Sequence, residues 1–353
     1  MRSEQEQVQL CIPRIVEWYA ASRRVLPWRQ DPTPYQVWIS EIMLQQTRIE
    51  AVIGYYERFL QELPTVEALA AVEENRLLKL WEGLGYYSRA RNLKKAAKLV
   101  VERYEGRLPD TAAELKKLPG IGDYTAGAIA SLAFGRPEPA VDGNVLRVMT
   151  RILASGEDVM LPATRRRISA LLRVEYPSGE QAGLLTEGLM ELGETLCIPN
   201  GEARCTLCPV RSLCQARISG TVDRYPVKSP PRGRRVEQRT VLLLRWGETA
   251  AIRRRENKGL LAGLWEFPNL SGWLEEAELR RLLRDQGAEL LSAAPLPEAR
   301  HVFTHVEWHM RAWEFRCARP WGDFVWASPE QIAAGYSIPT AFRAYQTALE
   351  GGA

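Results

Sequence analysis

The chain has 353 residues, of which 46% are hydrophobic and 25% are charged, and its formal net charge is +4. This length suits two or three domains with sizeable cores, and the composition is that of an ordinary globular protein. No apolar run approaches the roughly 20 residues of a membrane span, and the first ten residues contain no signal-peptide core. We therefore expect a cytoplasmic protein with no membrane partner.

From Ile12 to about Arg217 the apolar residues follow an almost continuous helical pattern. The segment 34–63, "PYQVWISEIMLQQTRIEAVIGYYERFLQEL", has the apolar spacing of two helices with a buried face. Residues 65–85 and 88–106 continue as helices, each followed by a glycine in the C-cap role. Further helical patterns occupy residues 142–154, 164–177 and 180–197.

The stretch 115–135, "LKKLPGIGDYTAGAIASLAFG", interrupts one helical pattern and starts another at once. Gly120 and Gly122 permit positive φ and a close backbone approach. The free N–H groups at the start of the next helix favour a phosphate oxygen at this position. The pattern indicates a helix-hairpin-helix DNA-binding element, and a tight interhelical turn without a ligand is the alternative.

Four cysteines, Cys197, Cys205, Cys208 and Cys214, lie within 18 residues of one another. In a cytosolic chain such a group favours a metal site over disulfides. Four thiolates can surround either a zinc ion or a [4Fe–4S] cluster, and the spacing alone does not choose between them. The remaining cysteines are isolated, and we expect them to be inert core residues.

Two carboxylates stand in otherwise apolar company. Glu41 has apolar neighbours along its helix, so burial would raise its pKa and let it act as a general acid. Asp142 stands at an expected helix start, where an ionised carboxylate can stabilise developing positive charge. The alternatives are an exposed helix glutamate for Glu41 and a plain N-cap for Asp142.

The excess positive charge lies in residues 221–240, which hold six basic and two acidic residues. Because this segment is also rich in proline, we interpret residues 218–236 as a basic linker that can approach phosphates. A merely solvated linker is the alternative.

Beyond Arg235 the pattern changes from helical to alternating. Residues 234–257 indicate a β-hairpin, residues 273–287 a helix, and residues 299–319 a pair of strands rich in aromatic residues. We therefore predict a separate α+β domain over residues 237–353.

Several motifs recur in a fixed order: "PWR" at 27–29, "PYQVWISEIMLQQT", "LWEGLGYYSRARNL", "LPGIGDYTAGAIASLAFG", "VDGNVLRV" and then the cysteine cluster. This ordered set resembles the helix-hairpin-helix DNA glycosylases of the endonuclease III superfamily, and within it the MutY-type adenine DNA glycosylases. The resemblance covers nearly the whole chain. It implies a monomeric repair enzyme that acts on double-stranded DNA and removes adenine mispaired with 8-oxoguanine or guanine.

The resemblance also implies a domain plan. A catalytic region over 1–217 would contain a six-helix core at 28–135 and an iron–sulfur subdomain made of 1–27 and 136–217. A MutT-like lesion-recognition domain would follow the linker. The resemblance selects [4Fe–4S] over zinc, although seven residues instead of the family's six separate Cys197 from Cys205. Its loop would offer Arg204 and Arg211 to phosphates.

For catalysis, the resemblance assigns to Glu41 the protonation of adenine N7. It assigns to Asp142 the stabilisation of an oxocarbenium-like sugar and help in activating water, as in glycosidases. Asn144 would hold Asp142 or the sugar region. Tyr124 stands where bifunctional relatives have a lysine that forms a Schiff base. A phenol cannot do this, so the resemblance implies a monofunctional enzyme that leaves an abasic site.

For DNA recognition, the resemblance places Gln46 and Thr47 near the lesion. It makes Leu84 and Tyr86 a wedge that fills the gap left by the flipped base. Helix-end packing is the alternative for the wedge pair. Arg29 and Glu187 align with residues of the adenine pocket, and Glu187 also fits a plain helix surface.

The expected MutT-like domain lacks the Gx5Ex7REUxEExGU motif of Nudix hydrolases, so we expect it to recognise rather than hydrolyse. The family's Phe-Ser-His lesion-reading loop falls on Phe303, Thr304 and His305, where threonine keeps the hydroxyl of serine. An ordinary alternating strand is the alternative for this loop.

Three other functions compete with this reading. The first is a bifunctional glycosylase and lyase, which Tyr124 and the extra domain disfavour. The second is a DNA-binding protein that has lost activity, which Glu41 and Asp142 disfavour. The third is a Nudix hydrolase with a DNA-binding appendage, which the missing acidic motif disfavours.

Overall fold

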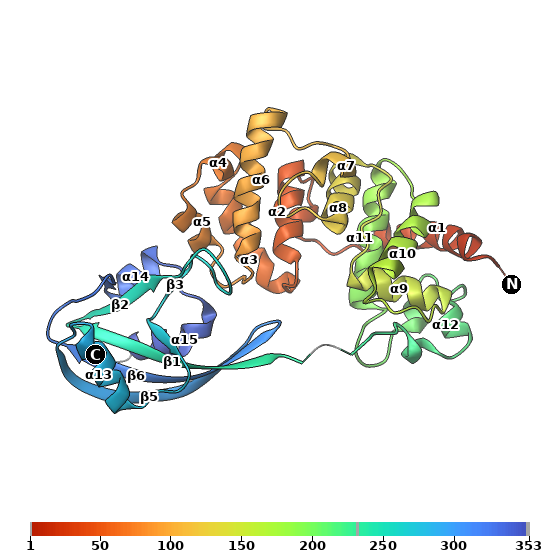
Figure 1. Ribbon diagram of the computed structural model, residues 1–353. Coiled ribbons are helices and arrows are strands. Elements are labelled where there is room, and N and C mark those ends of the chain that lie inside the picture. Colours follow the sequence, from red (N-terminus) through yellow and green to blue (C-terminus); the bar gives the residue numbers. More distant parts are fainter. Residues whose placement is uncertain (1, 231–232, 351–353) are drawn as a thin grey trace. The chain divides into compact units, whose positions relative to one another are not determined.

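A computed structural model describes residues 2–230 and 233–350 (Figure 1). Contacts along the chain divide it into two compact units. The first consists of Met1–Val72 and Asn92–Pro230, and the second of Glu73–Arg91 and Pro231–Ala353. Residues 73–91 join the C-terminal unit because the Lys79 ammonium donates to the Tyr336 carbonyl at 3.3 Å, and Glu82 accepts from the Ile338 N–H at 3.0 Å.

The first unit is helical, as the apolar periodicity predicts. Its long helices are α1 (Glu4–Ser22), α2 (Pro34–Leu44), α3 (Ile49–Glu62), α6 (Ser88–Tyr104, which begins in the second unit), α8 (Asp123–Phe134), α9 (Gly143–Leu153), α10 (Pro162–Val174) and α11 (Glu180–Thr195). Its short elements are α4 (Val66–Ala71), α7 (Ala112–Leu115), α12 (Gln215–Ile218) and the 3-10 turns η1 (Pro27–Arg29), η2 (Cys205–Leu207) and η3 (Val222–Arg224).

Helix boundaries follow local capping more closely than apolar spacing. Helix α1 begins well before Ile12, because Ser3 and Glu6 form a capping box at its first turn. The pattern over 65–85 is two helices, since the Glu73 carboxylate caps the N-terminus of α5 (Glu74–Leu80). The helix before the glycine hairpin is the single turn α7, which the sequence pattern does not show.

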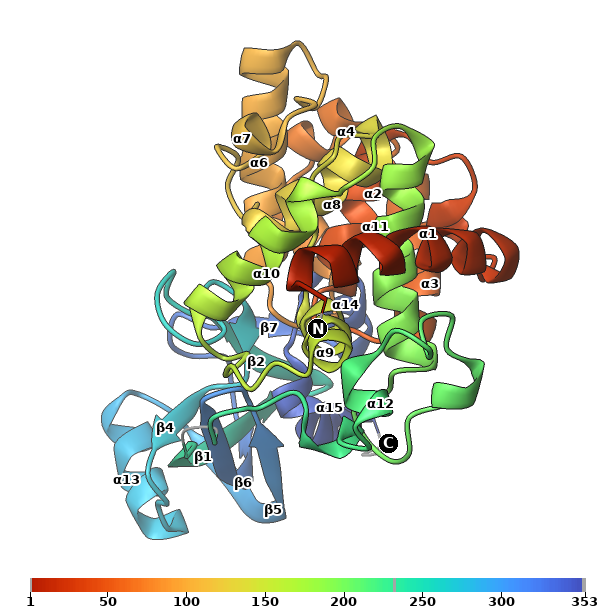
Figure 2. The same ribbon diagram turned by 90° about the vertical axis from the view of Figure 1, so that its right-hand side faces the viewer.

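The core of the first unit joins segments distant in sequence. Helix α1 packs against α11, and α11 also packs against α8 and α9 (Figures 1 and 2). One apolar cluster contains Ile15 of α1, Val145 of α9, Ile168 of α10 and Leu185 of α11. Helix α2 packs against α8 and buries Trp38 completely. This packing fixes the ends of α2, α8, α9 and α11 with respect to one another.

The second unit contains a mixed seven-stranded sheet in the order β3-β2-β1-β6-β5, with β4 paired to β1 and β7 to β2. The strands are β1 (Arg235–Trp246), β2 (Thr249–Arg254), β3 (Trp265–Glu266), β4 (Asn269–Ser271), β5 (Leu290–Val302), β6 (Val306–Cys317) and β7 (Val325–Ala327). The predicted hairpin β1–β2 and the strand pair β5–β6 are confirmed as antiparallel pairs, whereas β1 and β6 pair in parallel.

Strand β1 is buried on both faces of this sheet. Val241 and Leu243 pack into one apolar cluster, and Leu242 and Leu244 pack into another. Residues of α14 (Pro329–Gly335) and α15 (Arg343–Glu350) complete the first cluster, and residues of α13 (Glu276–Asp285) complete the second. The unbroken run "TVLLL" therefore reflects burial on both sides of the sheet, and the predicted α+β class is confirmed.

The two hairpin glycines give a matched test of this fold. Gly120 has φ +82°, and a Cβ there would lie 2.7 Å from the Asn92 Cβ, whereas a Cβ at Gly122 would meet nothing within 4 Å. We expect Gly120→Ala to lower the free energy of unfolding by about 1–3 kcal/mol. Gly122→Ala should lower it by less than about 1 kcal/mol. Urea denaturation measures both, and equal losses would contradict the assigned hairpin geometry.

Candidate active site

A cavity of about 530 Å³ in the first unit contains the predicted catalytic residues. Its lining includes residues of η1, α2, α8, the start of α9 and α11. Six residues singled out from the sequence share this lining: Arg29, Glu41, Tyr124, Asp142, Asn144 and Glu187. Thr47 also lines the cavity, whereas its neighbour Gln46 is exposed and has φ 58°.

Glu41 is a buried carboxyl group, with 5% of its surface exposed. The Tyr124 hydroxyl donates a hydrogen bond to Glu41 Oε2 at 2.8 Å. Burial raises the pKa of Glu41 to about 7, and the charges of Glu187 and Asp142 act in the same direction. The bond from Tyr124 opposes this rise. The alternative of an exposed helix glutamate is therefore wrong.

Tyr124 is the second residue of α8, directly after the glycine hairpin. It stays a neutral phenol, because burial raises its pKa well above the ordinary value. Its hydroxyl therefore remains a hydrogen-bond donor to Glu41 across the working pH range. It also lies 3.6 Å from the Met190 sulfur, which closes the cavity from α11. The residue after the glycine hairpin thus holds the buried carboxyl group.

Asp142 is both the N-cap of α9 and a cavity residue, so the N-cap alternative and the predicted site describe one side chain. Its Oδ1 accepts from the Val145 N–H at 2.7 Å, and its Oδ2 accepts from Asn144 Nδ2 at 2.9 Å. Burial raises the pKa of Asp142, while these hydrogen bonds act in the opposite direction. Each carboxylate oxygen therefore has one fixed donor, which sets the direction in which the group faces.

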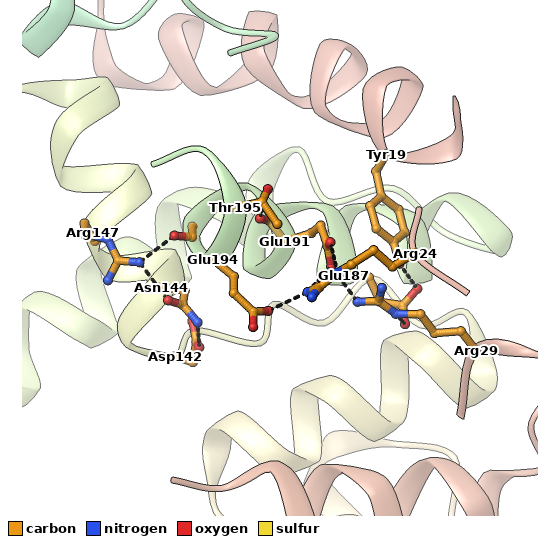
Figure 3. Close-up of polar contacts among 11 residues, drawn as sticks. Tyr19, Arg24, Arg29, Asp142, Asn144, Arg147, Glu187, Glu191, Glu194 and Thr195 are labelled. Carbon is orange, nitrogen blue, oxygen red and sulfur yellow. Dashed lines mark hydrogen bonds and ion pairs between the residues drawn. The ribbon is translucent and has the colours of Figure 1, made fainter. Parts of the chain in front are cut away.

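Asn144 is held in turn by Arg147, a buried residue of α9 (Figure 3). Arg147 Nη2 donates to Asn144 Oδ1 at 2.7 Å and to the Gly193 carbonyl at 2.8 Å. Arg147 Nε donates to the Cys197 carbonyl at 2.8 Å. A continuous set of hydrogen bonds therefore links the first cysteine of the cluster to Asp142. Sequence reasoning missed Arg147, since its spacing is that of any helix residue.

Arg29 and Glu187 form an ion pair at the cavity wall, with Arg29 Nε 3.0 Å from Glu187 Oε1. The Tyr19 hydroxyl donates to the other oxygen of Glu187 at 2.8 Å, and Arg29 also contacts Glu191 of α11 (Figure 3). The interpretation of Glu187 as a plain helix-surface residue is therefore wrong. Sequence reasoning missed Tyr19 and Glu191, because nothing in a local pattern pairs residues of α1 with residues of α11.

The four predicted cysteine ligands line one small cavity of about 20 Å³ beside α9 and α11. Arg151 Nη1 donates to the Cys197 sulfur at 3.3 Å, so a cation is in place to compensate thiolate charge. Among residues 2–230 and 233–350, no three potential ligand side chains are close enough together to hold a metal ion. The four thiols and the arginine are of the residue types that thiolate-bound metal groups use.

The glycine hairpin has the form that a phosphate site requires. Gly120 takes the positive φ that the tight turn needs, and Gly122 is the N-cap of α8. Gly122 has no side chain that could cap the helix, so no N-cap side chain competes with a phosphate for the first N–H groups of α8.

In the second unit, Leu84 is buried, with 7% of its surface exposed, whereas Tyr86 is 48% exposed. The Tyr86 hydroxyl lies 2.5 Å from Thr304 Oγ1, so a predicted wedge residue and a predicted lesion-reading residue meet within this unit. Thr304 and His305 are exposed at the tip of the β5–β6 hairpin, which the bond from the Phe303 N–H to the Val306 carbonyl closes at 2.8 Å. The alternative of an ordinary strand through these residues is wrong.

Comparisons with known proteins show the family to which the chain is similar. The HhH-GPD superfamily of base excision DNA repair proteins matches residues 39–174, and a NUDIX domain matches residues 240–348. The adenine DNA glycosylase of Homo sapiens is 35% identical over 83% of this chain and 64% of its own length. That of Rattus norvegicus is 35% identical over 83% of this chain and 68% of its own length. This chain belongs to the adenine DNA glycosylase family.

Solved structures extend the comparison to the fold of this family member. A thermostable thymine-DNA glycosylase is 27% identical, with a TM-score of 0.54 over 61% of this chain and 98% of its own. An endonuclease III bound non-covalently to DNA is 23% identical, with a TM-score of 0.52 over 62% of this chain and 99% of its own. The likeness to the endonuclease III structure is one of fold, and it agrees with the predicted helical fold of the first unit.

Adenine DNA glycosylases are hydrolases that act on N-glycosyl bonds, and this chain matches both an HhH-GPD model and a NUDIX model. It spans less than two thirds of the human relative's length. Within the part of the chain that the structure describes, no helix has the length and apolarity needed to cross a membrane.

The raised pKa of Glu41 predicts a pH-dependent change in stability. Between the ordinary value of 4.5 and about 7, the folded protein holds a proton that the unfolded chain has lost, so wild-type stability falls as pH rises. We expect Glu41→Gln to remove this penalty and to gain up to about 3 kcal/mol relative to wild type between pH 4 and pH 8. Urea denaturation at both pH values measures the gain.

Glu114→Gln is a control of opposite sign. Hydrogen bonds from Lys117 and Tyr104 lower the pKa of Glu114, so this carboxylate favours the folded state at higher pH. Glu114→Gln should therefore lose stability relative to wild type as pH rises. A Glu41→Gln variant that behaved like Glu114→Gln would show that Glu41 is not desolvated.

Proposed function

We propose that this chain excises adenine paired with 8-oxoguanine or guanine in double-stranded DNA, by hydrolysis of the N-glycosidic bond, and leaves an abasic site. This proposal rests on the buried Glu41. Its pKa is about 7, and the Tyr124 hydroxyl donates a hydrogen bond to one of its oxygens. A carboxyl group that remains partly protonated at neutral pH, at the wall of a cavity of about 530 Å³, suits general acid catalysis on a nucleobase.

Adenine leaves poorly as an anion, so a proton must reach its ring as the bond to the sugar breaks. Glu41 donates this proton to N7, and the electron pair of the C1′–N9 bond passes to the purine. C1′ is left with oxocarbenium character, which the carboxylate of Asp142 stabilises. Water then adds to C1′ and gives up its proton to a carboxylate of the site. The target base must first rotate out of the duplex into the cavity.

Asp142 suits this role because it is held by two N–H donors and stays in place as charge develops. Asn144 Nδ2 donates to it at 2.9 Å, and Arg147 holds Asn144 in turn through a bond of 2.7 Å. Such preorganised polar groups stabilise charge without reorganising during the reaction. Glu41 and Asp142 thus divide the work of acid and electrostatic stabiliser, and burial raises the pKa of both while the hydrogen bonds act in the opposite direction.

Tyr124 supports the monofunctional part of the proposal. Its phenol contacts Glu41 and cannot form the Schiff base by which a lysine at this place would cleave the strand. The product is therefore an intact strand with an abasic site.

Cys197, Cys205, Cys208 and Cys214 would hold a [4Fe–4S] cluster, with Arg151 compensating thiolate charge. When bound, the cluster supplies a cross-link that orders the loop from Cys197 to Cys214. Arg211 and Arg204 of this loop would contact phosphates, together with the N–H groups beside Gly120 and Gly122.

We assign lesion reading to the second unit, with Thr304 at its hairpin tip and Tyr86 as its partner. Leu84, Gln46, Thr47, Phe303 and His305 complete the proposed interface with DNA. Residues 237–353 would thus act as the recognition domain and residues 1–217 as the catalytic region, joined by a basic linker, and the protein would act as a monomer.

Single-turnover release of adenine from a duplex with adenine opposite 8-oxoguanine tests this function. We expect wild type to release adenine and the strand to break only after alkali, because an abasic site without lyase chemistry is stable until then. Glu41→Gln should reduce the rate at least about 100-fold, since a missing general acid removes a factor of about 10² to 10⁴. No release by iron-loaded wild type would contradict the proposal, and strand cleavage without alkali would contradict the monofunctional assignment.

Tyr124→Phe tests the proposed acid through its pH profile. The Tyr124 hydrogen bond lowers the pKa of Glu41, so its loss should raise that pKa and move the alkaline limb of the rate profile to higher pH. Tyr35→Phe is a matched control. Tyr35 is a buried tyrosine of α2 whose hydroxyl donates to the Leu63 carbonyl and not to Glu41. Equal profiles for wild type and Tyr124→Phe would show that Glu41 is not the titrating acid.

A further inference from the structure

Glu191 forms a second layer behind the wall of the catalytic cavity. It lies on α11, one helical turn after Glu187, and its side chain is 3% exposed. Glu187 lines the cavity and Glu191 does not. A base bound in the cavity would therefore contact Arg29 and Glu187 but could not touch Glu191.

Two arginines converge on the Glu191 carboxylate (Figure 3). Its Oε2 accepts from Arg29 Nη2 and from Arg24 Nη2, each at 3.0 Å, and its Oε1 accepts from Arg24 Nε. Arg24 also contacts Glu194 at 2.8 Å. A carboxylate held by a two-point bond to Arg24 has one fixed orientation, so it presents Oε2 to Arg29 in one direction only.

Arg29 has a different kind of environment on each side. Its side chain is 9% exposed, Nε contacts Glu187 at 3.0 Å, and Nη2 contacts Glu191 at 3.0 Å. The guanidinium carbon lies 5.4 Å from the centre of the Tyr19 ring. Among the hydrogen bonds between described residues, Nη1 has no partner although it is buried. Arg29 itself lines the cavity, so the direction of its guanidinium sets part of the shape and charge of the cavity wall.

A guanidinium is a rigid planar fork, so fixing two of its nitrogens fixes the third. With Glu187 alone as its partner, Arg29 could turn and place both Nη2 and Nε, or both Nη atoms, on that one carboxylate. Glu191 excludes this arrangement because it holds Nη2 at the far side. The orientation of the guanidinium therefore depends on a residue outside the cavity.

We propose that Glu191 is a positioning residue for base excision, which acts through Arg29 by fixing the orientation of its guanidinium, and of the Glu187 paired with it, at the wall that the flipped base would meet. This inference rests on the proposed function for the reaction it serves. The bonds within the cluster do not depend on that function. Arg24 contributes to this positioning, because its hydrogen bonds hold the Glu191 carboxylate next to Arg29.

The experiment compares Glu191→Gln with Glu266→Gln. Glu266 is an equally buried glutamate, 3% exposed, that also binds two arginines, Arg253 and Arg255, but it lies in the second unit. Both variants replace one charge of a buried ion-pair cluster and should lose similar stability in urea denaturation. Only Glu191→Gln should slow adenine release at saturating enzyme, by about 10- to 100-fold. Glu266→Gln should change this rate less than about twofold.

Two further readouts separate positioning from general damage. Affinity for a duplex holding a non-cleavable abasic analogue opposite 8-oxoguanine should change less than about threefold in Glu191→Gln, because the effect falls on the excision step. In a double-mutant comparison, adding Glu191→Gln to Arg29→Gln should slow release by less than about threefold, because Glu191 acts only through Arg29. If the double variant lost rate by the product of the two single-variant losses, Glu191 would act independently of Arg29 and the proposal would be overturned.

The ¹⁵Nε signal of Arg29 reports the cluster without catalysis. In wild type it should show restricted side-chain motion, and Glu191→Gln should increase that motion. If wild type releases no adenine while the ¹⁵Nε signal of Arg29 behaves as expected, the proposed function fails, but the fixing of Arg29 by Glu191 is supported. If Glu191→Gln releases adenine at the wild-type rate, or leaves the ¹⁵Nε signal of Arg29 unchanged, the proposal that Glu191 positions Arg29 is overturned. Should Glu191→Gln not fold, Glu191→Asp, which keeps the charge but shortens the side chain, replaces it with an expected loss of about 5- to 30-fold.

Discussion

The site depends on the removal of one carboxyl group, that of Glu41, from water. A buried carboxyl group favours its protonated form, and here burial is the largest influence on its pKa. The Tyr124 hydroxyl, which donates to it at 2.8 Å, and the nearby charge of Arg29 lower the pKa against this effect. Burial and these two partners together leave the pKa near neutrality, where a general acid is most useful.

The same desolvation explains the polar groups around the cavity. Asp142 is buried as well, so its oxygens need fixed donors, and the start of α9 and Asn144 supply them. Behind Asn144 stands Arg147, and behind Arg29 stands Glu191. Buried ion pairs contribute little net stability, since desolvation offsets much of their attraction. Their value here lies in fixing the direction of the side chains that line the cavity.

Most of the fold was predictable because it follows from local chemistry. The apolar spacing of 34–63 gives α2 and α3, and the alternation after Arg235 gives the β1–β2 hairpin. The short turn α7 and the long strand β5 were not predictable. Helix α7 has too few residues to show a period, and β5 contains prolines at a sheet edge, where the missing N–H groups need no partner.

Of the site, the sequence by itself determined the chemical types: two carboxylates in apolar surroundings, a phenol after a glycine hairpin, and four clustered cysteines. Local composition and motif order are enough for this, because each group stands within a recognisable segment. Only the tertiary structure decided that Glu41 is buried and that Tyr124 contacts it. It alone decided that Tyr19 and Glu191 support the cavity wall, and that Tyr86 meets Thr304. These facts depend on the packing of segments far apart in the chain, and desolvation and hydrogen-bond geometry arise only when those segments meet.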